Sequence, residues 1–576
     1  MKINRLDDDG TGTTFDIGDV NGEPALRITP GGSSDETKLA YPVRGDELGG
    51  WALHGEVVLN VYLPPENALN PNTFFLGLGD VTSGWTWVGG QFGIADGTNG
   101  WIKVTFPLVP ALREAREDRA YVMYVAFFHQ EDNGAKPPLT EPFYLGNIVL
   151  EMENAPDGPE IEALYQQEAE ALLAMDDAAL VDAVARKTFD FFWHEASPRT
   201  GLIRDRNTVN SSASIASVGF GLAAIPVAIE RGWITRDEGY ERARVTLDTF
   251  VSGGVQGEHG FFYHFVDVET GQRRCNSELS SIDTALLVAG ALVAGQYFEG
   301  TDVQRLADTL YENVEWDWMA AGATVPRMGW FPENGFLSAS WDHFDESLIL
   351  YVLALGSPTH PIPASAWESW RRPVNLEGEY IYLPGEPLFV YQYPLAFADL
   401  RDKEDAYANY WNNTVRACER NRQFTIDRSD RYQTYRDGVW GLSASDGPFG
   451  YRAFGAAEGN HNGTIAPYAS VACLPFTPEI ALEGMRAMLR VYGSRVWGKY
   501  GFVSAINADE DWYSHEHIGI DQGDILLMIA NWQDGAVWEW FMSHPRVQFG
   551  LDAMGFIEST GDYAITPAYL ARVRGQ

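Results

Sequence analysis

A chain of 576 residues, 45% of them hydrophobic, is long enough to bury the cores of two or three domains. Its 41 Lys and Arg residues against 80 Asp and Glu residues give a formal net charge of −39, and a field of that sign repels phosphate backbones. We therefore expect no nucleic-acid partner, whereas an uncharged glycan would meet no electrostatic penalty. The same acidity also fits a simple adaptation for solubility or for a salty environment.

The location and the cofactor needs of the chain are constrained by what the sequence lacks. No apolar run reaches the roughly 18–20 residues of a membrane-spanning helix, so we expect no membrane partner. The N-terminal sequence MKINRLDDDGTG has no apolar signal segment, which favours the cytoplasm for the chain as given, or the periplasm or exterior if a signal peptide was removed. No Walker loop, Rossmann fingerprint or nucleophile elbow is present, and no cofactor is expected.

The residues that commonly bind metals do not form a metal-binding pattern. Cys275, Cys418 and Cys473 are far apart, odd in number and contain no CxxC pair, which suggests neither a disulfide framework nor a zinc site. His515 and His517 flank a glutamate, but their spacing comes without a third ligand. We therefore expect no metal ion.

Residues 1–152 are predicted to form a jelly-roll-like β-sandwich that resembles a carbohydrate-binding module. Alternating apolar and polar residues, bounded by Gly, Pro, Asn and Asp, indicate short strands of regular spacing. The predicted strands are Ala25–Pro30, Glu56–Pro64, Trp101–Val109, Tyr121–Phe128 and Phe143–Met152. Trp85, Trp87 and Trp101 are expected either to stack on sugars or to pack in a purely structural core.

The pattern changes to helix after a linker at Glu153–Glu160. Residues 153–175 hold this linker and a leading helix at Ile161–Met175, and residues 176–576 follow as one domain that begins with a helix at Asp176–Ala196. Helix after helix without strand pairs favours an all-α domain in which paired helices close into a toroid and gather loops at one end. Further helices are predicted at 215–231, 236–251, 282–298, 302–312, 344–355, 403–421, 465–473, 477–491, 521–532 and 535–542.

Carboxylates recur where the loops of this domain meet the following helices, each beside aromatic residues, Gly or His. A carboxylate in a first helical turn is often only a cap worth roughly 0.5–2 kcal/mol, a reading that fits Asp283 and Asp521 taken singly. The recurrence of carboxylates at many such junctions instead indicates an enzyme that cleaves glycosidic bonds. In such an enzyme one carboxylic acid protonates the leaving oxygen, and a second carboxylate activates water or attacks the anomeric carbon. The loop acids are Asp205, Glu278, Asp283, Asp342, Asp345, Glu346, Asp446 and Asp521.

Several long sequence blocks resemble a known family. They are FDFFWHEASPRTGLIRDR (Phe189–Arg206), SSIDTALLVAGALVAGQYF (Ser280–Phe298), ESLILYVLALGSPTHPI (Glu346–Ile362), VYQYPLAFADLRD (Val390–Asp402), WGLSASDGPFGY (Trp440–Tyr451) and IGIDQGDILLMIANW (Ile518–Trp532). In this order they closely resemble the glucoamylase-like domain of bacterial β-1,2-glucanases, glycoside hydrolase family 144, and of relatives fused to cyclic β-1,2-glucan synthases. The resemblance covers about residues 175–560 and excludes the N-terminal sandwich. It implies an (α/α)6 toroid that hydrolyses β-1,2-glucan with inversion, either as an endo-enzyme or by releasing sophorose.

The resemblance also implies roles for single residues. Glu346, at the start of the helix that ends in LGSPTHP, is the expected general acid. An inverting partner lies roughly 6.5–9.5 Å away, and Asp521 is the first choice for the base, with Asp446 and Asp283 as alternatives. Sugar-binding or supporting roles are expected for Asp205, Glu278, Asp342, Tyr393, Trp440 and His515.

Other functions remain open at this point. Asn462 stands where relatives carry an acid before the GTIAP run, which leaves room for a different sugar or linkage at the subsite near it. The alternatives are a glycosidase or transglycosylase on another glycan, and a non-catalytic glycan-binding protein that keeps the toroid. The sequence does not indicate an oligomeric state.

Overall fold

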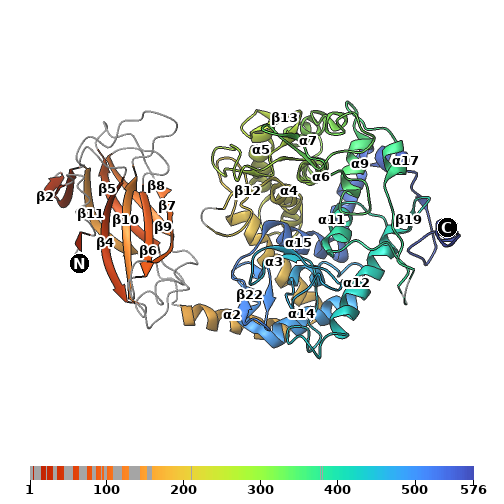
Figure 1. Cartoon of the computed structure of the whole chain (residues 1–576). Helices are drawn as coiled ribbons and strands as arrows, with labels where there is room; N and C mark the ends of the chain where they lie inside the picture. The colour runs from red at the N-terminus through yellow and green to blue at the C-terminus, as the bar shows by residue number, and fades with distance from the viewer. Residues whose placement is uncertain are drawn as a thin grey trace. The chain divides into compact units, whose positions relative to one another are not determined.

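Two compact units make up the chain, Met1–Leu164 and Tyr165–Gln576 (Figure 1). The computed structural model describes the strands of the first 151 residues and residues 158–575, except residues 209, 210, 377 and 379. The side chains of Trp85, Trp87 and Trp101 lie outside the described residues.

Antiparallel strands in two sheets build the first unit. The five-stranded sheet has the order β1 (Asn4–Arg5), β4 (Glu36–Arg44), β10 (Ala120–Phe128), β6 (Phe74–Asp80) and β7 (Thr86–Phe92). The six-stranded sheet has the order β2 (Thr14–Val20), β3 (Glu23–Thr29), β11 (Phe143–Glu151), β5 (Glu56–Leu63), β9 (Gly100–Pro107) and β8 (Ile94–Ala95). Each of the five strands predicted from alternation matches one of these strands to within two residues at either end.

Helices of two kinds alternate along the second unit, with one exception. Helices of the first kind are buried on nearly all sides: α4 (Ile215–Glu230), α6 (Ser281–Tyr297), α9 (Leu348–Gly356), α11 (Phe389–Phe397), α13 (Pro467–Val471) and α15 (Gly519–Gln533). Helices of the second kind bury one face: α3 (Asp177–His194), α5 (Arg236–Val251), α7 (Asp302–Glu312), α12 (Tyr410–Ile426) and α14 (Pro478–Tyr492). The exception lies between α9 and α11, which are separated only by the short helix α10 (Ser365–Ser369). Because an apolar helix must be covered on every side, this alternation places the first kind inside and the second kind outside.

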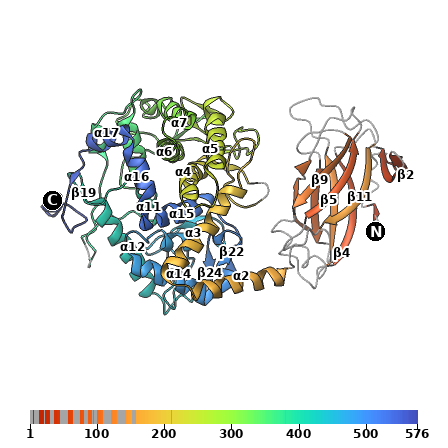
Figure 2. The same cartoon turned by 180° about the vertical axis from the view of Figure 1, so that it is seen from behind.

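The inner helices pack against one another around a shared core. Helix α4 packs against both α6 and α15, α6 packs against α9, α9 against α11, and α15 against both α11 and α13. Helices α4 and α15 therefore lie side by side although they come from opposite ends of the unit (Figure 2). The contact of α4 with α6 is close, since a Cβ on Gly290 would lie only 1.8 Å from the carbonyl oxygen of Gly219.

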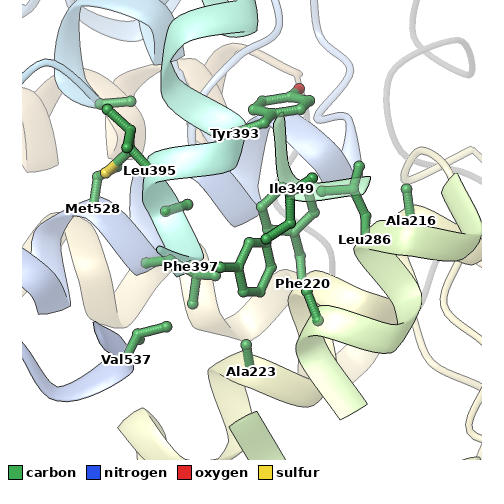
Figure 3. Close-up of a cluster of buried hydrophobic side chains, with 14 of the residues drawn as sticks. Ala216, Phe220, Ala223, Leu286, Ile349, Tyr393, Leu395, Phe397, Met528 and Val537 are labelled. Carbon is green, nitrogen blue, oxygen red and sulfur yellow. The ribbon is translucent and has the colours of Figure 1, made fainter. Parts of the chain in front are cut away.

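Aromatic rings fill the space between these helices. The ring of Phe220 on α4 lies 5.3 Å from that of Tyr393 and 5.6 Å from that of Phe397, both on α11 (Figure 3). All three side chains are at most 3% exposed. The core thus ties α4 to α11 and holds the N-terminal ends of the inner helices, where the loop carboxylates lie, in fixed positions.

Most predicted helices are confirmed, and the differences have local causes. Helix α12 begins at Tyr410 and not near Lys403, because Lys403–Glu404 forms strand β19, which pairs with β26 (Ile557–Glu558). Helix α11 was not predicted, and it contains Pro394. The remaining helices are α2 (Gly158–Leu173), α8 (Trp316–Met319), α10 (Ser365–Ser369), α16 (Ala536–Ser543), α17 (Pro545–Ala553) and α18 (Pro567–Arg574). Within the described part of the chain, no helix combines the length and the apolar character that a bilayer crossing needs.

The expectation of no disulfide was wrong. Cys418 of α12 and Cys473, two residues after α13, form a disulfide with a Cα–Cα distance of 6.3 Å, and both are fully buried. They are separated by 55 residues and meet only in the folded chain, so their spacing carried no signal. Cys275 is an exposed thiol.

Removal of this disulfide is expected to destabilise the helical unit. The double substitution Cys418→Ala and Cys473→Ala releases the 55-residue segment between them in the unfolded state, and cross-links of this kind typically contribute about 2–4 kcal/mol. Denaturant unfolding under non-reducing conditions should show a loss of that size, while Cys275→Ala should unfold as the wild type does. An unchanged midpoint in the double variant would mean that the cross-link adds nothing to stability.

Candidate active site

The imidazole of His264 lies between two carboxylates. Its Nδ1 is 3.2 Å from Oε1 of Glu278, in the loop before α6, and its Nε2 is 3.5 Å from Oδ1 of Asp283, in the first turn of α6. The hydroxyl of Ser280 donates to the other oxygen of Asp283. Burial lowers the pKa of His264, but the charges of Asp283 and Glu278 outweigh it and raise that pKa to about 9. The ring is therefore a cation at neutral pH.

His264, Glu278 and Asp283 could in principle also hold a metal ion. Among the described residues, these three form the group whose possible ligand atoms all lie within 4.8 Å of one another. The two carboxylates, however, contact different nitrogens of one ring. That arrangement suits a protonated imidazolium, which donates from both nitrogens, whereas a metal ion needs its ligands to converge beside one nitrogen.

Glu346 lies next to this group, in the segment that leads into α9. The indole Nε1 of Trp341 donates to Ser281 Oγ at 2.8 Å, which fastens this segment to the first turn of α6 beside Asp283. Burial raises the pKa of Glu346 well above its usual value, the negative charges of Asp283 and Asp345 raise it further, and His264 opposes them. The half-buried carboxyl thus favours its protonated form, the state that a general acid requires.

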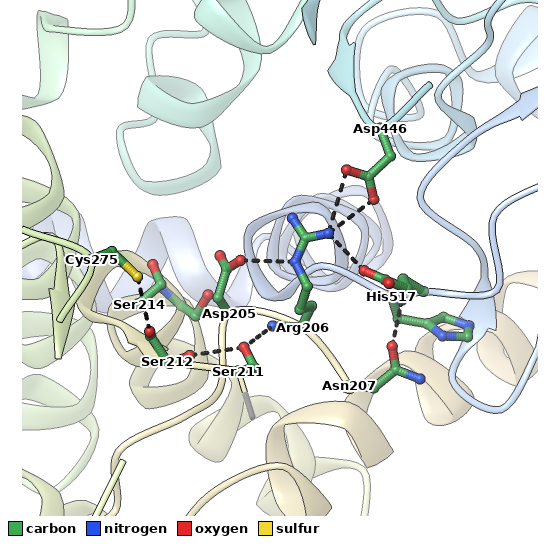
Figure 4. Close-up of polar contacts among 11 residues, drawn as sticks. Asp205, Arg206, Asn207, Ser211, Ser212, Ser214, Cys275, Asp446 and His517 are labelled. Atoms are coloured by element: carbon green, nitrogen blue, oxygen red, sulfur yellow. Dashed lines mark hydrogen bonds and ion pairs between the residues drawn. The ribbon is translucent and has the colours of Figure 1, made fainter. Parts of the chain in front are cut away.

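A second group of carboxylates surrounds Arg206 (Figure 4). The guanidinium Nη1 lies 2.6 Å from Oε2 of Glu516 and 3.1 Å from Oδ2 of Asp446, and Nε lies 3.2 Å from Oδ2 of Asp205. Burial lowers the pKa of Arg206, but these carboxylates raise it above its usual value. A single cation therefore holds acids from three separate segments of the chain together.

Asp521, in the first turn of α15, lies beside this second group. The backbone N–H of Gly519 donates to the carbonyl oxygen of Asp205 at 2.7 Å, which fixes the start of α15 at the Arg206 loop. Asp521 is 2% exposed, and its Oδ2 has no hydrogen-bond partner among the described residues. Burial raises its pKa well above the usual value, Asp446 raises it further, and Arg206 lowers it. Asp521 makes no capping hydrogen bond to its helix, so the expectation that it is only a helix cap is wrong.

Asp205 and Tyr451 link the two groups. Burial raises the pKa of both Asp283 and Asp521, and the charge of Asp205 raises both further. Burial of the Tyr451 hydroxyl raises its pKa, and the charges of Asp521, Asp205, Asp446 and Glu346 raise it further. The backbone supports this link, because the N–H of Asp205 donates to the carbonyl oxygen of Ser212 at 2.8 Å and the N–H of Ile215 donates to that of His264 at 3.2 Å. The two groups therefore adjoin and form one polar centre.

Six of the sequence-derived candidates belong to this centre, and Trp440 does not. The six are Asp205, Glu278, Asp283, Glu346, Asp446 and Asp521. Trp440 is 1% exposed, and its Nε1 donates to the carbonyl oxygen of Ile480 at 3.3 Å. Its indole therefore packs in the core, so of the two expected roles, sugar binding and support, its burial favours support. A sequence shows that a residue is aromatic, but it does not show whether the ring is exposed in the fold.

The remaining three candidates lie around this centre or outside it. Tyr393 is buried in α11, and the charge of Asp521 raises the pKa of its hydroxyl after the larger effects of burial and Tyr468. Asp342 forms an ion pair with Arg371 at 2.8 Å, with 41% of its side chain exposed. His515 is exposed and directly precedes Glu516.

Several members of the centre were not singled out from the sequence. His264, Arg206 and Tyr451 act on acids that are far from them in the chain, so only the folded arrangement identifies them. Asp524 is fully buried, both its oxygens lack a partner among the described residues, and burial raises its pKa well above the usual value. Its position three residues after Asp521, on the same helical face, was the one available signal.

Comparison with known proteins relates most of the helical unit to one group. The model of the Glycoamylase family, described as "Putative glucoamylase", matches residues 338–545. A relative from Parabacteroides distasonis, named exo beta-1,2-glucooligosaccharide sophorohydrolase (non-reducing end), is 30% identical over 425 residues. This match covers 67% of the present chain and 59% of that relative, so it spans less than two thirds of the relative's length.

Solved structures of similar proteins give the same relationship. The endo-β-1,2-glucanase from Chitinophaga pinensis, solved with sophorotriose and glucose, is 31% identical with a TM-score of 0.64 and covers 67% of this chain and 99% of its own. A β-1,2-glucanase from Parabacteroides distasonis is 21% identical with a TM-score of 0.64 and covers 95% of this chain and 96% of its own. The second likeness is one of fold, and it extends over both units.

Proposed function

The chain belongs to the Glycoamylase family of glucoamylase-like proteins, and we propose that it is a glycoside hydrolase that cleaves β-1,2-glucan with inversion. The observation that carries this proposal is the presence, in one polar centre, of a carboxyl that favours its protonated form and a separate group of acids around Arg206. The β-1,2-glucan substrate follows from the names of the relatives and from the sequence blocks shared with family 144. Endo action and release of sophorose both remain compatible with them.

Glu346 and Asp521 are proposed as the acid and the base. Glu346 gives its proton to the leaving glycosidic oxygen while Asp521 takes a proton from the water that attacks the anomeric carbon. Asp283 is a weaker choice for the base, because Ser280 and His264 occupy its oxygens on the Glu346 side of the centre. Asp446 is engaged by Arg206, whereas Oδ2 of Asp521 has no partner among the described residues and can bind water.

The other polar residues are proposed to support this pair. Asp205 and Glu278 hold Arg206 and His264 in place. Tyr393 is buried in α11, and the charge of Asp521 acts on its hydroxyl. Asp342 and His515 stay candidates for sugar contacts away from the acid pair. No metal ion or cofactor takes part in the proposed reaction.

The domain architecture is part of the same proposal. We propose an (α/α)6 toroid over residues 176–576, in which α3–α4, α5–α6, α7–α9, α10–α11, α12–α13 and α14–α15 are the outer and inner partners. The packing of α15 against α4 supports closure of the ring. Residues 1–152 are proposed as a jelly-roll-like sandwich of the carbohydrate-binding type, and residues 153–175 as a linker with the leading helix.

Product analysis on a panel of glucans tests the proposed activity. The purified protein, incubated with soluble β-1,2-, β-1,3-, β-1,4- and α-1,4-glucans, should release sophorose or longer β-1,2-oligosaccharides from the first alone. Products from a different glucan would favour the alternative glycosidase. Calorimetric binding without any product would favour a glycan-binding protein, and longer oligosaccharides built from shorter ones would favour a transglycosylase.

Removal of the Arg206 charge should shift the pH dependence of this activity. Burial raises the pKa of Asp446 and of Asp521, and the charge of Arg206 opposes that rise, so Arg206→Gln is expected to raise both pKa values further. A base must be ionised to act, and activity is lost as the pH falls through its pKa. The acid limb of kcat/KM against pH is therefore expected to move upward by about 1 unit or more. Arg371→Gln, which removes a peripheral ion pair, serves as the control, and an unmoved acid limb in Arg206→Gln would exclude both acids as the base.

A further inference from the structure

A short hairpin carries the loop that contains Asp446. Strand β20 (Ala444–Ser445) pairs with β21 (Arg452–Ala453), with Ala444 opposite Ala453, and residues 446–451 connect them. The hydroxyl of Tyr468 donates to the carbonyl oxygen of Ala444 at 3.1 Å, and Asp446 is paired with Arg206. The start of this hairpin is therefore anchored to the core and to the polar centre.

Two aromatic side chains project from this anchored loop. Phe449 is 81% exposed, more than any other large hydrophobic side chain of the described residues, and Tyr451 is 54% exposed. Phe454, directly beyond the hairpin, is by contrast buried. Exposure of large apolar rings has a free-energy cost in water, and a contact that covers both rings would remove that cost.

The placement of Tyr451 connects this surface to the acids. The loop begins at Asp446, whose Oδ2 lies 3.1 Å from Nη1 of Arg206, so Tyr451 is five residues from the second acid group. Burial raises the pKa of the Tyr451 hydroxyl, and the charges of Asp521 and Glu346 are among those that raise it further. Phe449 lies two residues earlier, nearer the tip of the loop. The hairpin therefore brings both rings to the edge of the polar centre, with Tyr451 next to its anchored strand β21 and Phe449 farther along the loop.

Aromatic side chains are well suited to bind a chain of glucosyl units. One face of a glucosyl ring presents C–H groups, which pack against the flat face of Tyr or Phe and exclude water from both. A stacked ring needs no charge on the ligand, in keeping with an uncharged glycan and with the net charge of −39 on the protein.

We propose that Phe449 and Tyr451 form an aromatic subsite in which Tyr451 stacks on the glucosyl unit at the cleaved bond and Phe449 on a unit farther along the chain. This inference rests on the proposed function for its substrate class. It assigns the hairpin a role in chain-length preference, because only an oligosaccharide long enough to reach Phe449 gains the outer contact.

Calorimetric titration with linear β-1,2-gluco-oligosaccharides of increasing length tests the subsite. Glu346→Gln serves as the background so that turnover does not interfere. Phe449→Ala is expected to weaken binding of the longer oligosaccharides by roughly three- to tenfold and to leave the shortest ligands unaffected. Tyr451→Ala should weaken binding at every length, whereas Tyr451→Phe, which keeps the ring, should bind as the background protein does.

Phe549→Ala supplies the matched control, since Phe549 is 54% exposed on α17, and its affinities should equal those of the background. Equal affinities in Phe449→Ala, Tyr451→Ala and the background would overturn the subsite, as would a background protein that binds none of the oligosaccharides. Hydrolysis by the wild type is scored separately. Binding that depends on the aromatic rings without any hydrolysis would contradict the proposed activity and leave the subsite standing.

Discussion

Glu346→Gln is expected to fold as the wild type does and to lose a factor of about 10²–10⁴ in kcat on its glucan substrate. Glutamine has nearly the same shape but carries no acidic proton, so the leaving oxygen departs without protonation. The burial that raises the pKa of Glu346 acts on the charged form, and a neutral amide escapes that penalty. Initial rates of product release, with thermal melting as the check on folding, give the result.

The control for this prediction is Glu368→Gln, an exposed residue on the short helix α10, which should keep the activity of the wild type. A Glu346→Gln protein with near-normal rates would remove this glutamate from the role of acid. The alkaline limb of the pH profile provides a second reading. Because the pKa of Glu346 is raised, activity should persist above the usual carboxyl range and decline only where the acid finally loses its proton.

Asp521→Asn is the second substitution with a large expected effect, a loss of about 10²–10⁴ in kcat. The amide keeps the size of the side chain but does not accept the proton of the attacking water. Asp283→Asn and Asp446→Asn, made in parallel, compare the three choices for the base in one assay. The largest loss is expected for Asp521, and a larger loss in either of the other two would transfer the role to that residue.

The stability of Asp521→Asn separates a functional acid from a structural one. Burial raises the pKa of Asp521 above its value in the unfolded chain, so this group stabilises the fold at low pH and loses that contribution as the pH rises through the raised value. Asp521 acts as the base only above that value, where it is ionised. At neutral pH the asparagine variant should therefore melt no lower than the wild type. A clear loss of stability would indicate that the carboxylate is needed for folding.

Much of the helical unit could be predicted from apolar periodicity. The α5 and α7 segments were predicted with the bounds that the structure gives, because their apolar residues recur at helical spacing and their ends carry caps such as Thr235. Helix α11 was missed because it is short and contains Pro394, which disfavours helix in isolation. In the fold, α9 and α15 pack on this segment, and tertiary contacts outweigh that local preference.

The candidate site could be predicted less completely. The position of an acid at a loop-to-helix junction is visible in a sequence, and this signal located Glu346, Asp283 and Asp521. Their electrostatic partners were not visible, since Arg206 gathers acids from positions as distant as 446 and 516. Burial is equally invisible in a sequence: Trp440 was expected to bind sugar or to support the site, and only its burial in the fold favours support.

Anomer-resolved NMR of freshly formed products tests the central claim most directly, because it reports how the acid and the base act together. With β-1,2-glucan as substrate, an acid and a base on opposite faces of the sugar release the new reducing end first as the α-anomer, which then converts slowly to the equilibrium mixture. That order is the predicted result. Initial appearance of the β-anomer would contradict it, since retention requires a covalent intermediate in place of the directly activated water.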